Sequence, residues 1–294
     1  MLEFIKLLLI GCAVGMGNVI PGVSGSTIAV VFGIYDRFIN AITLNFKKLW
    51  ANKKFVIPMV LGMLLGVLLF SKLVSYLYTH FPTQTNYAFT GLIIGSVPLL
   101  ISLVTKQKGE GKKSFWYYFS LVICAAAGIA LIYLFSILEG SVDKNTPEFS
   151  VLPELSVGLA LRIFIAGLLG AVAMIIPGIS GSLLMLIMGV YPIVISAISV
   201  LLQPSTFVHA CLLLLPNGIG VLLGLLLGAK LIGFMLKKAP GQSYAVILGL
   251  LLGSAVFMFP GFAGFTSAGV IAGSIIAFVG GILLAYFGSK ASSE

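Results

Sequence analysis

The stretch Pro21-Gly22-Val23-Ser24-Gly25-Ser26 interrupts a long apolar run, and it returns 156 residues later as Pro177-Gly178-Ile179-Ser180-Gly181-Ser182. The likeness continues beyond this break, because positions 21–42 and 177–198 agree at 10 of 22 places when aligned at that offset. At an offset of 158, a further series of glycine, lysine, proline, glutamine and serine positions agrees between 62–96 and 220–254. The chain is therefore an internal duplication.

The composition indicates the environment of the duplicated unit. The chain is 60% hydrophobic and 9% charged, with a mean hydropathy of +1.17, whereas soluble domains carry about 25% charged residues. This predicts a polytopic membrane protein. Its 17 basic residues outnumber its 8 acidic ones, but the lysines form short clusters between apolar segments, so nucleic-acid binding is not indicated. The three cysteines lie far apart inside apolar segments and predict no disulfide, metal site or cofactor.

Each half contains two apolar segments that flank the break and three further segments long enough to cross a bilayer. The predicted helices are 4–20, 26–44, 56–79, 87–104 and 115–138 in the first half, and 158–175, 183–202, 207–236, 244–260 and 268–288 in the second. We expect a loop around His80, Pro82 and Gln84. The break itself cannot continue a helix or face lipid, so each broken pair is predicted to be a re-entrant hairpin or two short spans that lie inside protein or line a cavity.

The division predicted from these segments is a first repeat at 1–140, an extracellular connection at 141–157 and a second repeat at 158–294. Each repeat makes an odd number of crossings, so the second copy must be inverted. Placing the lysine clusters of 47–54 and 106–113 in the cytoplasm leaves the acidic stretch 139–157 outside and both termini inside. The predicted fold is an all-α membrane protein with two inverted repeats, each a broken hairpin plus three transmembrane helices.

Inverted repeats with broken helices are typical of secondary transporters, whose site lies between the halves. Glycines in the breaks expose backbone N–H groups, serines add hydroxyl donors, and the following helices begin with their positive ends, a combination that favours an anion such as phosphate. The alternative interpretation is that these small residues serve only close helix packing, as we expect for Gly62-x-x-x-Gly66 and Gly91-x-x-x-Gly95. The predicted phosphate-binding residues are Gly22, Ser24, Gly25, Ser26, Thr27, Gly178, Ser180, Gly181, Ser182 and Arg37.

Arg37 has two interpretations. It lies eleven residues beyond Ser26, which is about 16 Å along a continuous helix, too far for direct contact with a phosphate at the break without a long reach or a moved helix. It either pairs with Asp36 or extends its charge toward the cytoplasmic face. Alternatively, its guanidinium receives a phosphate headgroup on that side.

The paired Pro-Gly-[Val/Ile]-Ser-Gly-Ser signatures, each followed by a Gly-x-Tyr that begins at Gly33 or Gly189, resemble the bacterial and archaeal polyprenyl-phosphate transporter family. The resemblance covers essentially the whole chain, although Asp36-Arg37 is replaced by Pro192-Ile193 in the second copy. It implies a flippase of the cytoplasmic membrane that returns undecaprenyl phosphate from the outer to the inner leaflet for cell-wall synthesis. The partners implied are this lipid and the bilayer, and the residues do not distinguish a proton from sodium as a coupling ion.

Two alternatives to this function follow from the residues. A membrane lipid phosphatase would need an acid, base or nucleophile with an activating partner. Asp36 is the single carboxylate beyond the first turn of the predicted spans, and His80 and His209 lie at segment ends, so the sequence favours a transporter over an enzyme. A secondary transporter of another small anion would use the same site and stays open.

Overall fold

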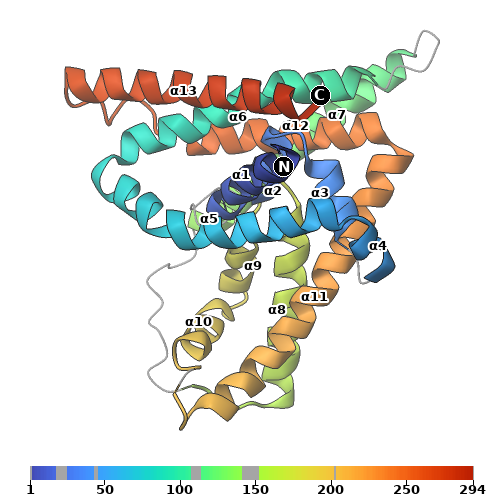
Figure 1. Ribbon diagram of the computed structural model, residues 1–294, viewed down its shortest axis with the longest axis vertical. Helices are drawn as coiled ribbons and strands as arrows, with labels where there is room; N and C mark the ends of the chain where they lie inside the picture. The colour runs from blue at the N-terminus through green and yellow to red at the C-terminus, as the bar shows by residue number, and fades with distance from the viewer. Residues whose placement is uncertain are drawn as a thin grey trace. The chain divides into compact units, whose positions relative to one another are not determined.

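The computed structural model of the chain describes residues 2–17, 25–42, 46–106, 114–140, 152–201 and 203–293. Their regular structure is helical (Figure 1). The helices of the first half are α1 (Leu2–Gly17), α2 (Gly25–Val31), α3 (Tyr35–Ala41), α4 (Phe46–Ala51), α5 (Lys53–His80), α6 (Pro82–Lys106) and α7 (Phe115–Gly140). Those of the second half are α8 (Val157–Ile175), α9 (Gly181–Ile187), α10 (Tyr191–Ser199), α11 (Phe207–Lys238), α12 (Pro240–Met258) and α13 (Ala268–Ser293).

Six of the described helices, α6, α7, α8, α11, α12 and α13, are long and apolar enough to cross a membrane. The pair α9 and α10 passes the same test as one unit, although its two helices are bent by 110° relative to each other. The prediction of an all-helical membrane protein with several spans is therefore confirmed.

The predicted single helices 26–44 and 183–202 are wrong, because each is two short helices joined at a glycine. In the first half the corner lies at Gly33, whose φ of 67° is in the left-handed region that glycine adopts without steric penalty. The N–H of Gly33 donates to the carbonyl of Val30 and the N–H of Ile34 to that of Ala29, both at 2.9 Å. This pattern is a Schellman motif, which ends α2 and lets α3 begin in a new direction.

The second half repeats this corner at Gly189, which has the same φ of 67°. The N–H of Gly189 donates to the carbonyl of Leu186 at 2.8 Å, and that of Val190 to Met185 at 2.9 Å. The Gly-x-Tyr element that follows each signature is therefore the end of one helix and the start of the next.

The predicted loop around His80, Pro82 and Gln84 is also wrong, since all three residues lie in helices and only Phe81 separates α5 from α6. Ala239 separates α11 from α12 in the same way. Phe81 has φ −135° and ψ 49°, and Ala239 has φ −140° and ψ 63°. Proline disfavours the helical conformation of the preceding residue and suits the first position of a helix, so both corners need one linking residue.

The chain forms two compact units. One contains residues 1–133, 176–178 and 232–294, and the other contains 134–175 and 179–231. In the first unit, α1 packs against α5. A Cβ added at Gly62 or Gly66 would overlap the backbone carbonyl of Leu8 or Cys12, so the predicted close packing at this glycine pair is confirmed.

The second unit contains the equivalent contact between α8 and α11. A Cβ at Gly220 or Gly224 would overlap the backbone carbonyl of Phe164 or Leu168. These four residues are the repeat partners of the four in the α1 and α5 contact, at the offsets of 158 and 156. The duplication therefore extends from the sequence to individual packing contacts.

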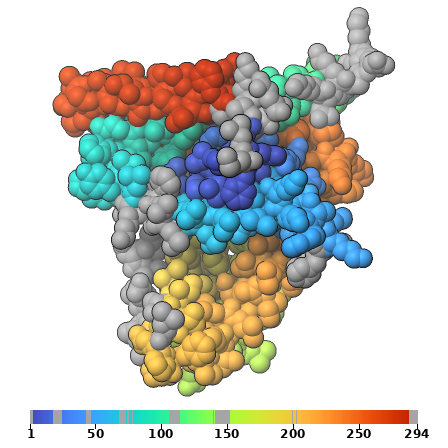
Figure 2. Space-filling view, viewed as in Figure 1, coloured from blue at the N-terminus to red at the C-terminus, as the bar shows by residue number. Residues whose placement is uncertain are grey.

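Within the first unit, helices from the two halves pack on each other. Gly91 and Gly95 place α6 against the backbone of α13, and Gly249 places α12 against the backbone of α7. The side chains of α13, drawn in red, lie directly on those of α6 (Figure 2). Because the second-last helix of each half packs on the last helix of the other, the compact units follow packing and not the repeat boundary.

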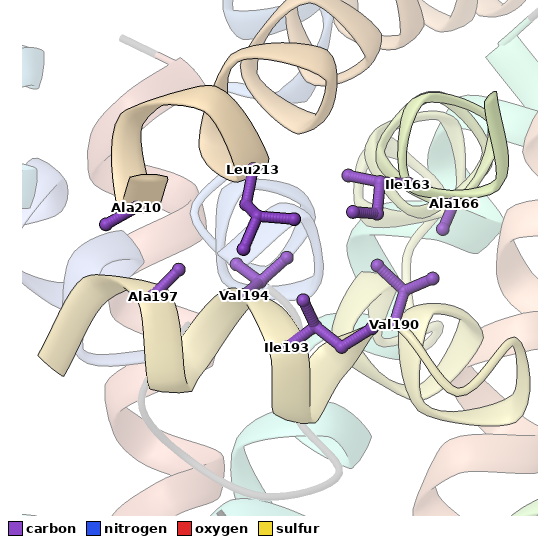
Figure 3. Packing of buried hydrophobic residues seen from close by; sticks show 8 residues of the cluster. All are labelled: Ile163, Ala166, Val190, Ile193, Val194, Ala197, Ala210 and Leu213. Carbon is purple, nitrogen blue, oxygen red and sulfur yellow. The ribbon is translucent and has the colours of Figure 1, made fainter. Parts of the chain in front are cut away.

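The core of the second unit lies where α10 meets α8 and α11 (Figure 3). Side chains from the three helices point toward one another in this cluster, and all are at least nine-tenths buried. The cluster consists of Ile163, Ala166, Val190, Ile193, Val194, Ala197, Ala210 and Leu213. Apolar packing therefore holds the helix that follows the Gly189 corner.

We predict that Gly189→Ala destabilises the protein by about 1–2 kcal/mol, because an L-residue in the left-handed region carries that penalty. The matched control is Gly218→Ala in α11, where an added Cβ meets nothing within 4 Å. That change should be neutral or stabilising by up to about 1 kcal/mol, since alanine is the better helix former. Thermal unfolding of both variants in one detergent measures the difference, and equal midpoints would contradict the role assigned to Gly189.

Candidate functional site

The second signature forms a turn between α8 and α9. Pro177 is fully buried, and Gly178 has a φ of 84°, a conformation that favours glycine. A Cβ at this position would overlap the hydroxyl of Ser254 and lie 3.0 Å from Cδ1 of Ile132. Ser180 then precedes the first residue of α9 in extended conformation, with φ −92° and ψ 122°. The turn thus depends on a glycine at 178 for both its conformation and its space.

The turn is joined to the first copy by a hydrogen bond. The N–H of Gly178 donates to Oγ1 of Thr27 in the first turn of α2, at 2.8 Å. Thr27 is 1% exposed, so this bond lies inside protein, as a break at membrane depth requires. The structure therefore brings together one predicted site residue from each copy, and the N–H of Gly178 is already engaged by Thr27.

Two predicted serines form a pair at the start of α9. The hydroxyls of Ser180 and Ser182 lie 2.8 Å apart, with either as the donor. Ser180 is half-buried and Ser182 is exposed, whereas Ser26 and Thr27 in α2 are buried. Ser180 and Ser182 thus offer hydroxyls that a ligand can reach. Gly22 and Ser24 lie outside the described residues.

Gly181 occupies a packing position. A Cβ there would overlap the carbonyl of Gly170 in α8 and come within 3.3 Å of Cβ of Met174. The backbones of α8 and α9 therefore approach closely at this point. The packing interpretation of Gly181 has direct support, and a bulky substitution there would disturb the fold before it affected any ligand.

Arg37 does not pair with Asp36. Its Nη2 lies 3.8 Å from Oε1 of Glu3, and its guanidinium carbon lies 4.6 Å from the ring centroid of Phe55. The side chains of Arg37 and Glu3 are 58% and 70% exposed, so this ion pair contributes little to stability. The distance of about 16 Å from the break, which assumes a continuous helix, does not apply either, because the chain turns at Gly33.

Asp36 instead accepts a short hydrogen bond at Oδ2 from the hydroxyl of Tyr244, which lies in α12 and is 6% exposed. This contact joins residues 208 positions apart, and its one signal in the sequence is the presence of a carboxylate in an apolar region. The repeat partners of the two residues are Pro192 and Asn86, which cannot reproduce the bond. The pair therefore distinguishes the first half from the second.

Asn217 is a second polar residue absent from the predicted site. It lies inside α11, is 8% exposed, and directs its amide Nδ2 toward Sδ of Met185 in α9 at 3.7 Å. Buried polar side chains in transmembrane helices are rare and often functional. An asparagine within an apolar run, directly after Pro216, is the signal that the sequence offered.

The described residues contain no group of three or more histidine, cysteine, aspartate or glutamate side chains that could hold a metal ion. The ring of His80 bonds to the carbonyl of Tyr76, and that of His209 bonds to the carbonyl of Pro153, each at 3.0 Å. Both histidines thus have backbone partners, His80 within its own helix and His209 at a residue 56 positions away. Among the described residues of the second break, the groups available to a ligand are the hydroxyls of Ser180 and Ser182.

We predict that Thr27→Val destabilises the protein by about 1–3 kcal/mol, because it leaves the N–H of Gly178 unsatisfied inside protein. Thr27→Ser keeps the acceptor and is the matched control. Thermal unfolding in detergent measures both effects. If the valine and serine variants unfolded at the same temperature, the hydrogen bond would not be what holds the two signatures together.

A family profile described as VCA0040-like, undecaprenyl phosphate translocase-like, matches residues 14–272. The chain is 34% identical to a polyprenyl-phosphate transporter of Staphylococcus aureus (strain NCTC 8325 / PS 47), over 85% of this chain and 84% of the relative. It is 26% identical to a polyprenyl-phosphate transporter of Vibrio cholerae serotype O1, over 88% of this chain and 79% of that relative. No solved structure matches the chain. The profile match and the similarity to the staphylococcal protein show that this multi-pass membrane protein belongs to the undecaprenyl phosphate translocase-like family of transporters.

Proposed function

We propose that this protein transports a polyprenyl phosphate, with undecaprenyl phosphate as its carrier lipid, from the outer to the inner leaflet of the cytoplasmic membrane. The observation that carries this proposal is the similarity to polyprenyl-phosphate transporters over more than four-fifths of the chain. Such a lipid keeps its tail in the bilayer, so the protein needs to replace the hydration of the phosphate alone. Accessible hydroxyls beside a break in a membrane helix suit that task.

The architecture that we propose for this transport is an inverted repeat with both termini in the cytoplasm. The recurrence of the Gly33 and Gly189 corners, the single-residue proline corners and the glycine contacts supports a structural duplication. The alternation of basic clusters with the acidic stretch 139–157 supports the opposite orientation of its two copies. An inverted pair lets one site face each side of the membrane in turn.

Cysteine labelling tests this topology. In a variant without native cysteines, Asn145→Cys should react with an impermeant reagent from outside, and Lys54→Cys should react only after the membrane is opened. This outcome follows from the odd number of crossings in each half and from the positive-inside rule. Reaction of position 145 only from the cytoplasmic side would overturn the inverted repeat.

We propose that the phosphate headgroup contacts two groups of residues, one after the other. Ser180 and Ser182 bind the headgroup at the break, supported by the 2.8 Å hydroxyl pair and the exposure of Ser182. Arg37 receives the headgroup on the cytoplasmic side, supported by its exposure and its contact with Phe55, which directly follows Lys53 and Lys54 in α5. A guanidinium that holds only a weak surface pair can exchange Glu3 for a bidentate phosphate.

Movement of a labelled polyprenyl phosphate between the leaflets of proteoliposomes tests the function directly. The double change Ser180→Ala and Ser182→Ala should weaken binding, since each hydroxyl that bonds to a charged group contributes about 1.5–3 kcal/mol, or roughly 10- to 100-fold in affinity. Arg37→Lys should slow the exchange of lipid between leaflets, because lysine keeps the positive charge but cannot form the two parallel hydrogen bonds of a guanidinium. Arg37→Ala removes the charge as well and should nearly abolish the exchange.

Two matched controls accompany these variants. Ser274→Ala removes a buried hydroxyl of α13 that has no hydrogen-bond partner, and Lys54→Ala removes an exposed cation at the start of α5. Both should leave exchange unchanged. Normal leaflet exchange in Arg37→Ala would show that Arg37 does not take part in transport. Uptake of inorganic phosphate without lipid exchange would show that the protein transports a small anion instead of a lipid.

A further inference from the structure

A cavity of about 380 Å³ lies in the first compact unit, where the end of α11 and the start of α12 meet α7. Its volume falls in the range of about 300–1,000 Å³ typical of ligand pockets. None of the described residues of the two signatures lines it. Its walls include Cys124, Phe234, Met235, Lys238, Gln242 and Val246.

The inner surface of the cavity is apolar. The amide Nε2 of Gln242 donates to Oγ of Ser120 at 3.4 Å, and the hydroxyl of Ser243 donates to the carbonyl of Ala239 at 2.8 Å. These polar groups are therefore satisfied within the protein. Phe234, Met235 and Val246 contribute hydrocarbon surface, so the cavity suits an apolar chain.

The positively charged side chain of Lys238 lines this apolar cavity. The ammonium of Lys238 lies 5.3 Å from the ring centroid of Phe234, and its side chain is exposed. Lys237 precedes it in the last turn of α11 but does not line the cavity. Among the described residues that line the cavity there is no aspartate or glutamate, and the charged one is Lys238.

Aromatic side chains lie beside the cavity. Gly241, at the start of α12, is so close to Tyr117 that a Cβ there would overlap the tyrosine hydroxyl. The neighbours of Tyr117 are Trp116 and Tyr118, which are 71% and 48% exposed and form an aromatic group typical of the membrane interface. Phe234 is itself 59% exposed, so the cavity is open to the protein surface beside this ring.

We propose that this cavity binds a bilayer phospholipid with an anionic headgroup. One acyl chain occupies the apolar space, and the phosphate bonds to the ammonium of Lys238. Basic pockets between transmembrane helices recognise anionic headgroups by this combination. The bilayer's own lipids surround the opening at high concentration, so mass action favours them as occupants over a scarce carrier lipid. The site is independent of the proposed transport and would stabilise the contact of α7 with α11 and α12.

The test uses the full-length protein in nanodiscs of phosphatidylcholine alone or of an equimolar mixture with phosphatidylglycerol. Native mass spectrometry then counts the lipids that stay bound to the protein when it is released from the nanodisc. The wild-type protein should retain phosphatidylglycerol in preference to phosphatidylcholine. Lys238→Gln should weaken this retention about tenfold, because a charge-assisted bond is lost. Lys237→Gln keeps that bond and should lose no more than about twofold.

A second pair of variants tests the cavity itself. Val246→Trp fills it and should abolish preferential retention, whereas Val256→Trp, at a position of α12 that is 79% exposed and outside the cavity, should not. If Val246→Trp does not fold, Cys124→Phe fills the same space from α7. If Lys237→Gln and Lys238→Gln lowered the retention of phosphatidylglycerol equally, the proposal would be overturned. Such a result would indicate general attraction of the anionic lipid to both lysines and not a bond to Lys238. Retention of added polyprenyl phosphate through Lys238, without phosphatidylglycerol, would overturn it as well and assign the cavity to the transported lipid.

Discussion

The structure depends on satisfying backbone groups where membrane helices stop. In hydrocarbon each unpaired N–H or carbonyl is penalised by several kcal/mol, so a helix can be interrupted only where protein supplies the partners. The N–H of Gly178 donates to the Thr27 hydroxyl, and the corners at Gly33 and Gly189 bond back to their own preceding helices. At these three described positions the N–H group is thus bonded to the preceding helix or to the other signature, and the accessible hydroxyls of Ser180 and Ser182 are left for a ligand.

Close backbone contact is the second requirement. Lipid tails are as apolar as leucine, so membrane helices gain little from burying apolar side chains and associate where small residues allow tight packing. Gly62 and Gly66 bring α5 against α1, and Gly220 and Gly224 bring α11 against α8. Because α6 packs on α13 and α12 on α7, neither half of the sequence contains all the partners of its own helices. The halves therefore need each other to complete their packing.

The duplicated sequence predicted most of the helices, the second break and the glycine contacts, since each of these has a local signal in the sequence, while the first break lies outside the described residues. The corners at Gly33 and Gly189 were missed because apolar residues continue through them, and hydropathy does not report φ. The bond from Tyr244 to Asp36 could not be predicted, because nothing local relates two residues 208 positions apart. Gly181 shows a further limit, since a glycine kept for packing and one kept for binding look alike in a sequence.

The two halves hold their corners by different interactions. After Gly33, α3 is fastened to α12 by a hydrogen bond from Tyr244 to the carboxylate of Asp36. After Gly189, α10 carries Pro192 at the equivalent position, and apolar packing against α8 and α11 holds it instead. A bond to a carboxylate is directional and depends on charge, whereas close van der Waals packing needs neither a charge nor one fixed bond direction. The duplicated helices therefore provide a common scaffold, and residues present in one copy alone, Asp36 in the first and Pro192 in the second, determine which kind of interaction holds each corner.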